Sequence, residues 1–193
     1  YYYELQNGSF EAPYMENNGQ VNSNTDSSII WKTTATGGNI ELIRGNGYKD
    51  FLGGFHGSWN THGFANAPMG SQVAEINADS TGALYQDVLT VPGTTLTWSL
   101  MHRARNRAKL YPTKYGGIAN ERYYSGYDTM FVIIAPTNKV RDISQENIKS
   151  IVESAFGVGA LTRYYEDGGK YEEEITEGNY AGIIVWRITD YIS

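Results

Sequence analysis

The stretch from Gln72 to Met101 limits the possible folds most, because turn signals divide it into three short strand-like segments. Turns are indicated at 79–82 and at 92–93, so the segments recur about every ten residues. Between Leu96 and Leu100 every second residue is apolar, which places these side chains on one face of a strand. This spacing predicts an all-β protein built as an antiparallel sandwich or barrel.

Shorter apolar runs predict further strands at 1–13, 40–43, 128–134 and 180–188, whereas residues 14–28 are rich in Asn and Ser and predict a loop. The composition favours the same class of fold. The 193 residues include 16 Tyr, which favours strands, and 22 Gly, which supplies bends.

One segment has the period of a helix. Ser144 is a suitable N-cap and Gly157 a suitable C-cap for it. Apolar residues recur between them at helical spacing, at Ile148, Ile151, Val152, Ala155 and Phe156. The charged residues 163–177 that follow predict a solvated hairpin or loop.

The length of 193 residues fits one domain, at roughly 100–200 residues per domain. We expect a single β-sandwich over residues 1–193 with insertions at about 106–127 and 137–179. The first residue is Tyr1 and no signal peptide is recognisable, so we expect a piece excised from a longer surface protein.

Charge and composition exclude several classes of function. The formal net charge of -6 lacks the basic footprint of a general nucleic-acid binder. No apolar run approaches the roughly 20 residues that span a membrane. The absence of Cys excludes disulfides, thiolate zinc sites and cysteine nucleophiles.

Residues that could carry catalysis are few. His56 and His62 lie six positions apart, which matches no common metal-ligand spacing, and His102 is expected to be structural or exposed. The acidic run 172–174 is typical of a solvated face, and Glu75 is more typical of an ion pair than of a catalytic carboxylate. We therefore expect a non-catalytic protein, and a hydrolase with a divergent site is the remaining enzyme alternative.

Aromatic side chains in two glycine-rich or basic segments are the better functional candidates. Tyr and Trp combine an apolar ring with a polar group, which suits stacking against the apolar face of a sugar ring. Trp31 and Trp98 follow strand patterns and are expected in the core. The predicted ligand-binding residues are Trp59, Phe55, His62, Tyr111, Tyr115 and Tyr124.

Several short motifs, in this order, resemble jelly-roll carbohydrate-binding modules of families four, nine and twenty-two, a galactose-binding-like β-sandwich of bacterial secreted and surface proteins. The opening Asn7-Gly8-Ser9-Phe10-Glu11 is followed by Trp31 at a similar distance. The middle of such modules is similar to Ala74-Glu75-Ile76, Leu84-Tyr85-Gln86 and Pro92-Gly93-Thr94. The run from His102 to Arg105 and Asp128-Thr129-Met130 resemble related surface modules, in which these pieces lie closer together.

The resemblance implies a secreted or cell-surface carbohydrate-binding module, often stabilised by calcium. By the match to the opening motif, Glu11 is implied as one calcium ligand and Asp190 on the last strand as another. The alternative is a bacterial surface adhesin or structural module that binds a host protein, because enlarged loops enlarge a contact surface. The expected partner is a glycan or a host surface protein, with no nucleic acid and no membrane insertion.

Overall fold

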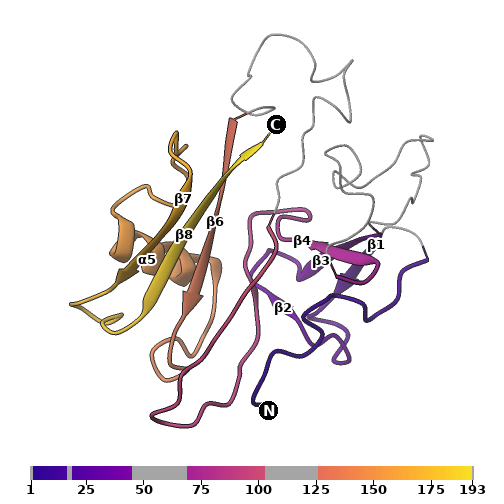
Figure 1. The fold of residues 1–193 in the computed structure, drawn as a ribbon. Helices are drawn as coiled ribbons and strands as arrows, with labels where there is room; N and C mark the ends of the chain where they lie inside the picture. The colour runs from indigo at the N-terminus through magenta and orange to yellow at the C-terminus, as the bar shows by residue number, and fades with distance from the viewer. Residues whose placement is uncertain (1, 17–18, 45–68, 103–125, 193) are drawn as a thin grey trace. The chain divides into compact units, whose positions relative to one another are not determined.

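The computed structural model describes residues 2–16, 19–44, 69–102 and 126–192 (Figure 1). The chain divides into two units, Tyr1–Met101 and His102–Ser193. All strand pairs in the described ranges are antiparallel, and one helix accompanies them. The predicted all-β class is therefore confirmed for this part of the chain, whereas the single domain over 1–193 stays a prediction. Within the same ranges, no helix has the length and apolar character needed to cross a membrane.

The first unit contains a three-stranded sheet in the order β1-β3-β4. Its strands are β1 (Gly19–Asn22), β3 (Asn39–Arg44) and β4 (Gln72–Glu75). A second pair joins two short strands, β2 (Lys32–Thr33) and β5 (Leu84–Tyr85). The strand predicted at 40–43 is thus the centre of the first sheet.

The core of this unit forms on one face of β3. Ile40 and Leu42 lie two residues apart, so they point to the same face, and both are almost inaccessible. Ile29 packs on them, and the rings of Phe10 and Trp31 stack beside them with centroids 5.1 Å apart. The predicted packing role of Trp31 is therefore confirmed.

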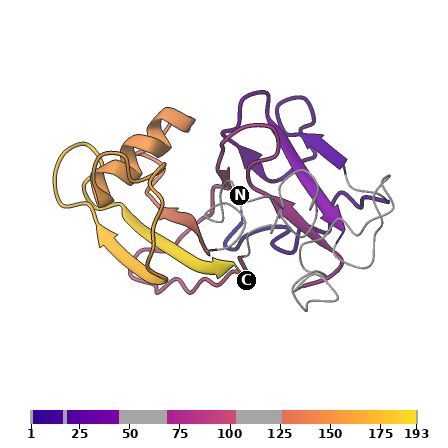
Figure 2. The same cartoon turned by 90° about the horizontal axis from the view of Figure 1, so that it is seen from above.

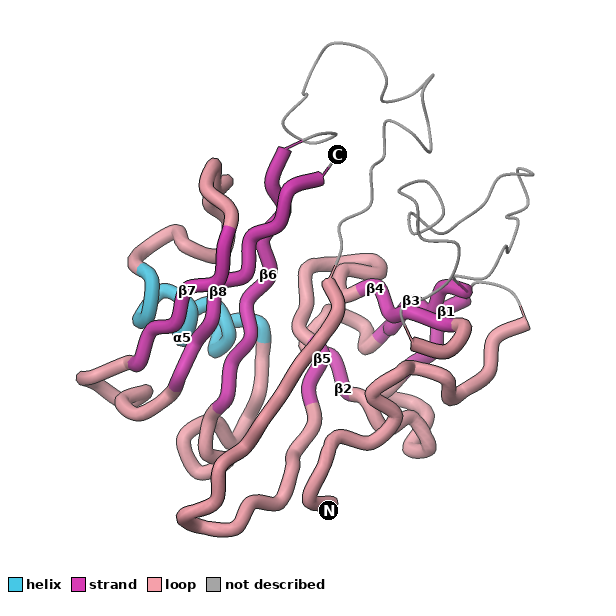
Figure 3. The backbone as a smooth tube through the Cα atoms, viewed as in Figure 1, coloured by secondary structure: helices cyan, strands magenta, loops and turns pink. Residues whose placement is uncertain are grey.

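The second unit contains a three-stranded sheet in the order β6-β8-β7 (Figures 1 and 3). Its strands are β6 (Gly126–Ile134), β7 (Gly169–Glu174) and β8 (Ile184–Ile192). β6 and β8 pair along their whole lengths, and β7 pairs with the first part of β8. Side chains that are direct partners across this ladder share a face of the sheet.

Helix α5 (Gln145–Phe156) packs against one face of this sheet (Figure 2). The Ser144 hydroxyl accepts a hydrogen bond from the N–H of Asn147, and the Gly157 N–H donates to the carbonyl of Glu153. Both predicted caps are confirmed. The core that the helix covers consists of Ile151, Val152, Ala160, Ile175, Ile183 and Val185.

The prediction of a strand at 95–100 is wrong. These residues have no regular secondary structure, and Figure 3 draws the chain after β5 as a loop. Leu96 and Leu100 are exposed, so the alternating pattern does not correspond to a buried face here, and the expected burial of Trp98 is only partial. A strand needs a hydrogen-bonded neighbour as well as alternation, and this segment has no ladder partner among the described residues.

Three other boundaries also differ from the prediction. The described part of 1–13 contains no strand, and β1 lies inside the predicted loop 14–28. β7 lies within the segments 163–177 and 137–179, which were expected to be a solvated hairpin or loop and an insertion. All residues of β7 are exposed, and it forms a hairpin with β8, so the hairpin alternative is the correct one. The pairing compensates for the polar sequence of β7, since backbone hydrogen bonds do not depend on apolar side chains.

Candidate functional site

A buried arginine lies on the helix-covered face of the second unit's sheet. Arg187 of β8 is 6% exposed and pairs directly with Phe131 of β6 and Tyr171 of β7. Its guanidinium carbon lies 4.0 Å from the ring centroid of Tyr165 and 4.3 Å from that of Tyr171. Such contacts between a cation and aromatic rings are favourable, and they hold both rings in place.

The loop before β7 supplies the counter-charge. Nη2 of Arg187 donates to Oδ2 of Asp167 over 2.9 Å, and the hydroxyl of Tyr171 donates to the same oxygen over 3.0 Å. The hydrogen bond from Arg187, followed by that from Tyr171, lowers the pKa of the Asp167 carboxyl below its ordinary value. We call Tyr165, Asp167, Tyr171 and Arg187 the Tyr171 cluster.

A glycine makes room for the ring of Tyr171. Gly169 has a φ of +133°, and a Cβ atom placed there would lie 3.3 Å from Cε2 of Tyr171. This conformation and this close approach both favour glycine over any other residue. Gly169 therefore allows the tyrosine ring to lie close to the backbone at the start of β7.

The two tyrosines of the cluster differ in accessibility. Tyr165 is buried, and its hydroxyl donates to the carbonyl of Ala160. Tyr171 is 43% exposed although its ring and hydroxyl are both held by neighbours. The Nε atom of Arg187 is buried and has no hydrogen-bond partner among the described residues. The cluster therefore presents one accessible, positioned aromatic ring with a carboxylate at its edge.

A histidine and two aspartates form a second cluster in this unit. Nε2 of His102 lies 3.2 Å from Asp128 and Nδ1 lies 3.3 Å from Asp190, and these two aspartates are direct partners across β6 and β8. Burial is the largest effect on the pKa of His102 and lowers it, but the hydrogen bonds and charges of Asp128 and Asp190 together raise it above 6.5. In the described ranges, no group of three histidine or acidic side chains is arranged to hold a metal ion.

Glu11, one of the two implied calcium ligands, accepts hydrogen bonds in the first unit. Its Oε1 accepts from the N–H groups of Ser71 and Gln72, and its Oε2 accepts from the hydroxyl of Ser71, each over 2.8 Å. Gly70 has a φ of +68°, and a Cβ there would overlap the Glu11 carboxylate at 2.3 Å. These bonds explain the position of Glu11 without a metal, and its role as a calcium ligand with Asp190 stays a prediction.

The predicted ligand-binding residues lie outside the described ranges; they are Trp59, Phe55, His62, Tyr111, Tyr115 and Tyr124. Tyr171 and Arg187 were not predicted as site residues, because Tyr171 lies in the charged segment 163–177, predicted as a solvated hairpin or loop, and Arg187 lies in the predicted strand 180–188. A signal was present there, since Tyr165 and Tyr171 flank Gly168-Gly169 within that charged segment. The partners of His102 were also missed.

Three comparisons with known proteins give no relative. No protein-family model, no curated protein and no solved structure matches the chain. The resemblance to carbohydrate-binding modules therefore stays a prediction.

Proposed function

We propose that this chain is a non-catalytic, extracellular carbohydrate-binding module with a jelly-roll β-sandwich fold. The observation that carries the proposal is the exposed ring of Tyr171, which is held by Arg187 and by Asp167. An aromatic ring with an accessible surface can stack against the apolar C–H face of a sugar. A carboxylate at its edge can accept hydrogen bonds from sugar hydroxyls.

Tyr171 supports the proposal mainly because its ring is already held in place before a ligand binds. Ordering a free side chain on binding costs about 0.5–1.5 kcal/mol, and a ring that is already held by neighbours avoids part of this cost. The predicted contacts from Trp59, Phe55, His62, Tyr111, Tyr115 and Tyr124 belong to the same proposal, as does calcium at Glu11 and Asp190. Secretion or surface display follows from the family resemblance alone.

A glycan array tests the proposal with the wild-type chain and two variants, Trp59→Ala and Tyr171→Ala. We expect binding to a restricted set of glycans that at least one of these variants weakens about tenfold or more. Wild-type protein that binds no glycan on the array would overturn the proposal. Binding that survives the loss of every predicted aromatic would exclude the proposed mode of recognition.

One observation favours a second function, an adhesin or structural module that binds a host protein. Five apolar residues are exposed in one stretch of the first unit, at Leu89, Val91, Leu96, Leu100 and Met101. Several large apolar side chains exposed along one short segment are a feature of protein-binding surfaces. Binding to enzymatically deglycosylated host-cell proteins, abolished by the variant Leu96→Asp/Leu100→Asp but not by Tyr171→Ala, would favour this function over the first.

A further inference from the structure

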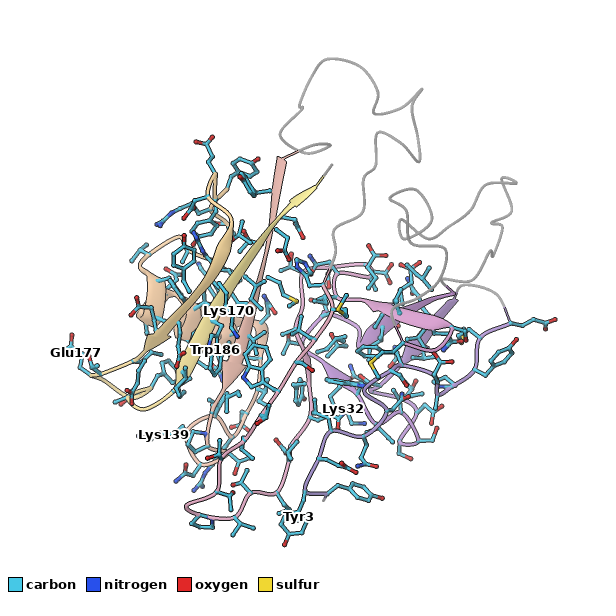
Figure 4. The ribbon with its side chains drawn as sticks, in the orientation of Figure 1. Tyr3, Lys32, Lys139, Lys170, Glu177 and Trp186 are labelled. Atoms are coloured by element: carbon cyan, nitrogen blue, oxygen red, sulfur yellow. The ribbon has the colours of Figure 1, made fainter. Side chains whose placement is uncertain are left out.

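The charges around Tyr171 differ between the two faces of its strand. Tyr171 and Glu173 alternate with Lys170, so the lysine belongs to the other face, where Trp186 of β8 also lies (Figure 4). Glu173 and Asp167 are both exposed, as is Glu166 before them. Between residues 166 and 173, the exposed charged groups on the Tyr171 side of the strand and in the loop before it are therefore acidic.

Two arginines near the cluster offset part of this acidity. Arg187 is buried and its charge is paired with Asp167 at 2.9 Å. The Arg163 guanidinium lies 5.8 Å from the ring centroid of Tyr165, the buried tyrosine, and its Nη2 donates to the carbonyl of Val158. Arg163 is exposed, so three acidic side chains (Glu166, Asp167 and Glu173) and two basic ones (Arg163 and Arg187) leave a small net negative charge, which disfavours an anionic ligand.

The carboxylate of Asp167 can accept a further hydrogen bond. A carboxylate offers about four acceptor positions. Arg187, the hydroxyl of Tyr171 and the backbone N–H of Asp167 itself occupy three of them. The side chain is 60% exposed, so a ligand hydroxyl can reach the remaining position and form a charge-assisted hydrogen bond.

We infer that the Tyr171 cluster is a binding site for a neutral saccharide, which stacks on the ring of Tyr171 and donates a hydroxyl to Asp167, and that it discriminates against acidic sugars. This inference rests on the proposed function and adds the site and the ligand class. Stacking requires no charge on the ligand, whereas the carboxylate at the edge requires a donor. A sugar carboxylate or sulfate provides neither a donor nor a favourable charge.

The test uses pairs of oligosaccharides that differ only in charge, measured by calorimetry with the full chain. Suitable pairs are a glucose oligomer and its glucuronate counterpart, and N-acetyllactosamine with and without terminal sialic acid. We expect the neutral member of at least one pair to bind about tenfold more tightly than the acidic member.

Variants locate the site. Tyr171→Ala removes the ring and is expected to weaken neutral-sugar binding at least about tenfold, whereas Tyr171→Phe keeps the ring and is expected to cost only a few-fold. Asp167→Asn removes the charge of the carboxylate and is expected to reduce the difference in affinity between neutral and acidic sugars. Tyr14→Ala is the matched control, since Tyr14 is an exposed tyrosine of the other unit.

A measurement on the wild type covers the case in which a variant fails to fold. Addition of the neutral sugar should shift the NMR signals of the Tyr171 ring, and those of Tyr14 should stay unchanged. Neutral-sugar binding that leaves Tyr171 unshifted and survives Tyr171→Ala would overturn this inference and leave the proposed function to the other aromatics. Tighter binding of the acidic members would also overturn it. If the wild type binds no saccharide at all, the proposed function itself fails.

Discussion

Nε2 of His102 lies 3.2 Å from Oδ2 of Asp128, and these two residues stand on either side of residues 103–127 in the sequence. Nδ1 of the same ring lies 3.3 Å from Asp190, the residue opposite Asp128 in the sheet. Two carboxylates directly opposite each other repel. An imidazole can donate to both only when both of its nitrogens carry a proton, so the geometry favours the charged form of His102.

Stability is therefore expected to depend on pH through His102. Because its pKa is raised in the folded chain, its favourable contribution is fully present below about pH 6.5 and is lost as the pH rises through the raised value. Urea unfolding in EDTA between pH 5.5 and 8.5 measures this, and His102→Gln should remove the His102 component of the decline. A wild type and a variant with the same pH dependence would show that the histidine makes no such contribution.

The two aspartates are not expected to contribute equally to the pKa of His102. Asp128 is 42% exposed and lies 3.2 Å from the ring, whereas Asp190 is 56% exposed and lies 3.3 Å from it, so water screens the charge of Asp128 less. Asp128→Asn should therefore lower the pKa of His102 more than Asp190→Asn does. An NMR titration of the imidazole signals in EDTA compares the two isosteric variants. The reverse order would contradict the arrangement of the cluster.

Removal of the N-cap should destabilise the second unit. Ser144→Ala leaves the N–H of Asn147 without its acceptor and is expected to cost about 1 kcal/mol of unfolding free energy. Ser154→Ala in the same helix is the control, because it removes only an exposed bond to the carbonyl of Ser150 and adds a better helix former. Chemical denaturation should show a loss for the first variant and little change or a small gain for the second.

The stability of the second unit should depend on the volume of the side chains in the core beneath α5. Ile151 is fully buried, so Ile151→Val is expected to cost about 0.5–1.5 kcal/mol and Ile151→Ala about 2–5 kcal/mol. Val158→Ala provides the control, since Val158 is 86% exposed and should change stability by less than about 0.5 kcal/mol. Equal losses for Ile151→Ala and Val158→Ala would mean that the helix does not pack as described.

Two variants separate the hydrogen-bond role of Glu11 from its proposed calcium role. Glu11→Ala leaves the N–H groups of Ser71 and Gln72 without an acceptor and is expected to cost about 1–3 kcal/mol even in EDTA. Glu11→Gln keeps an acceptor oxygen, so most of this stability should remain. If calcium binds as proposed, it raises the melting temperature of the wild type by mass action, and Glu11→Gln lacks that increase. A wild type that melts identically in calcium and in EDTA would exclude the calcium proposal.

Local signals in the sequence were sufficient to predict several secondary-structure elements. The helix was predicted together with its caps Ser144 and Gly157, because capping and helical periodicity act within a few residues of the chain. The strand predicted at 128–134 was found as β6 for a similar reason, since Met130 to Ile134 is a continuous apolar run. The alternation at 96–100 failed because local pattern does not ensure a partner strand.

The candidate sites depend on pairing between distant residues. Arg187 meets Tyr171 only because the register of β7 and β8 makes them direct partners, and a shift of one residue would move them to opposite faces. The sequence likewise contains His102 and Asp190 but nothing that brings together two residues 88 positions apart.

The sequence by itself therefore determined the all-β class of the described residues, the helix and the exclusion of disulfide and thiolate chemistry, since these depend on composition and on neighbours along the chain. Only the tertiary structure decided which arginine is buried between tyrosines and which histidine lies between two carboxylates. The physical reason is that strand register aligns side chains across a sheet, and register is set by the packing of the whole unit.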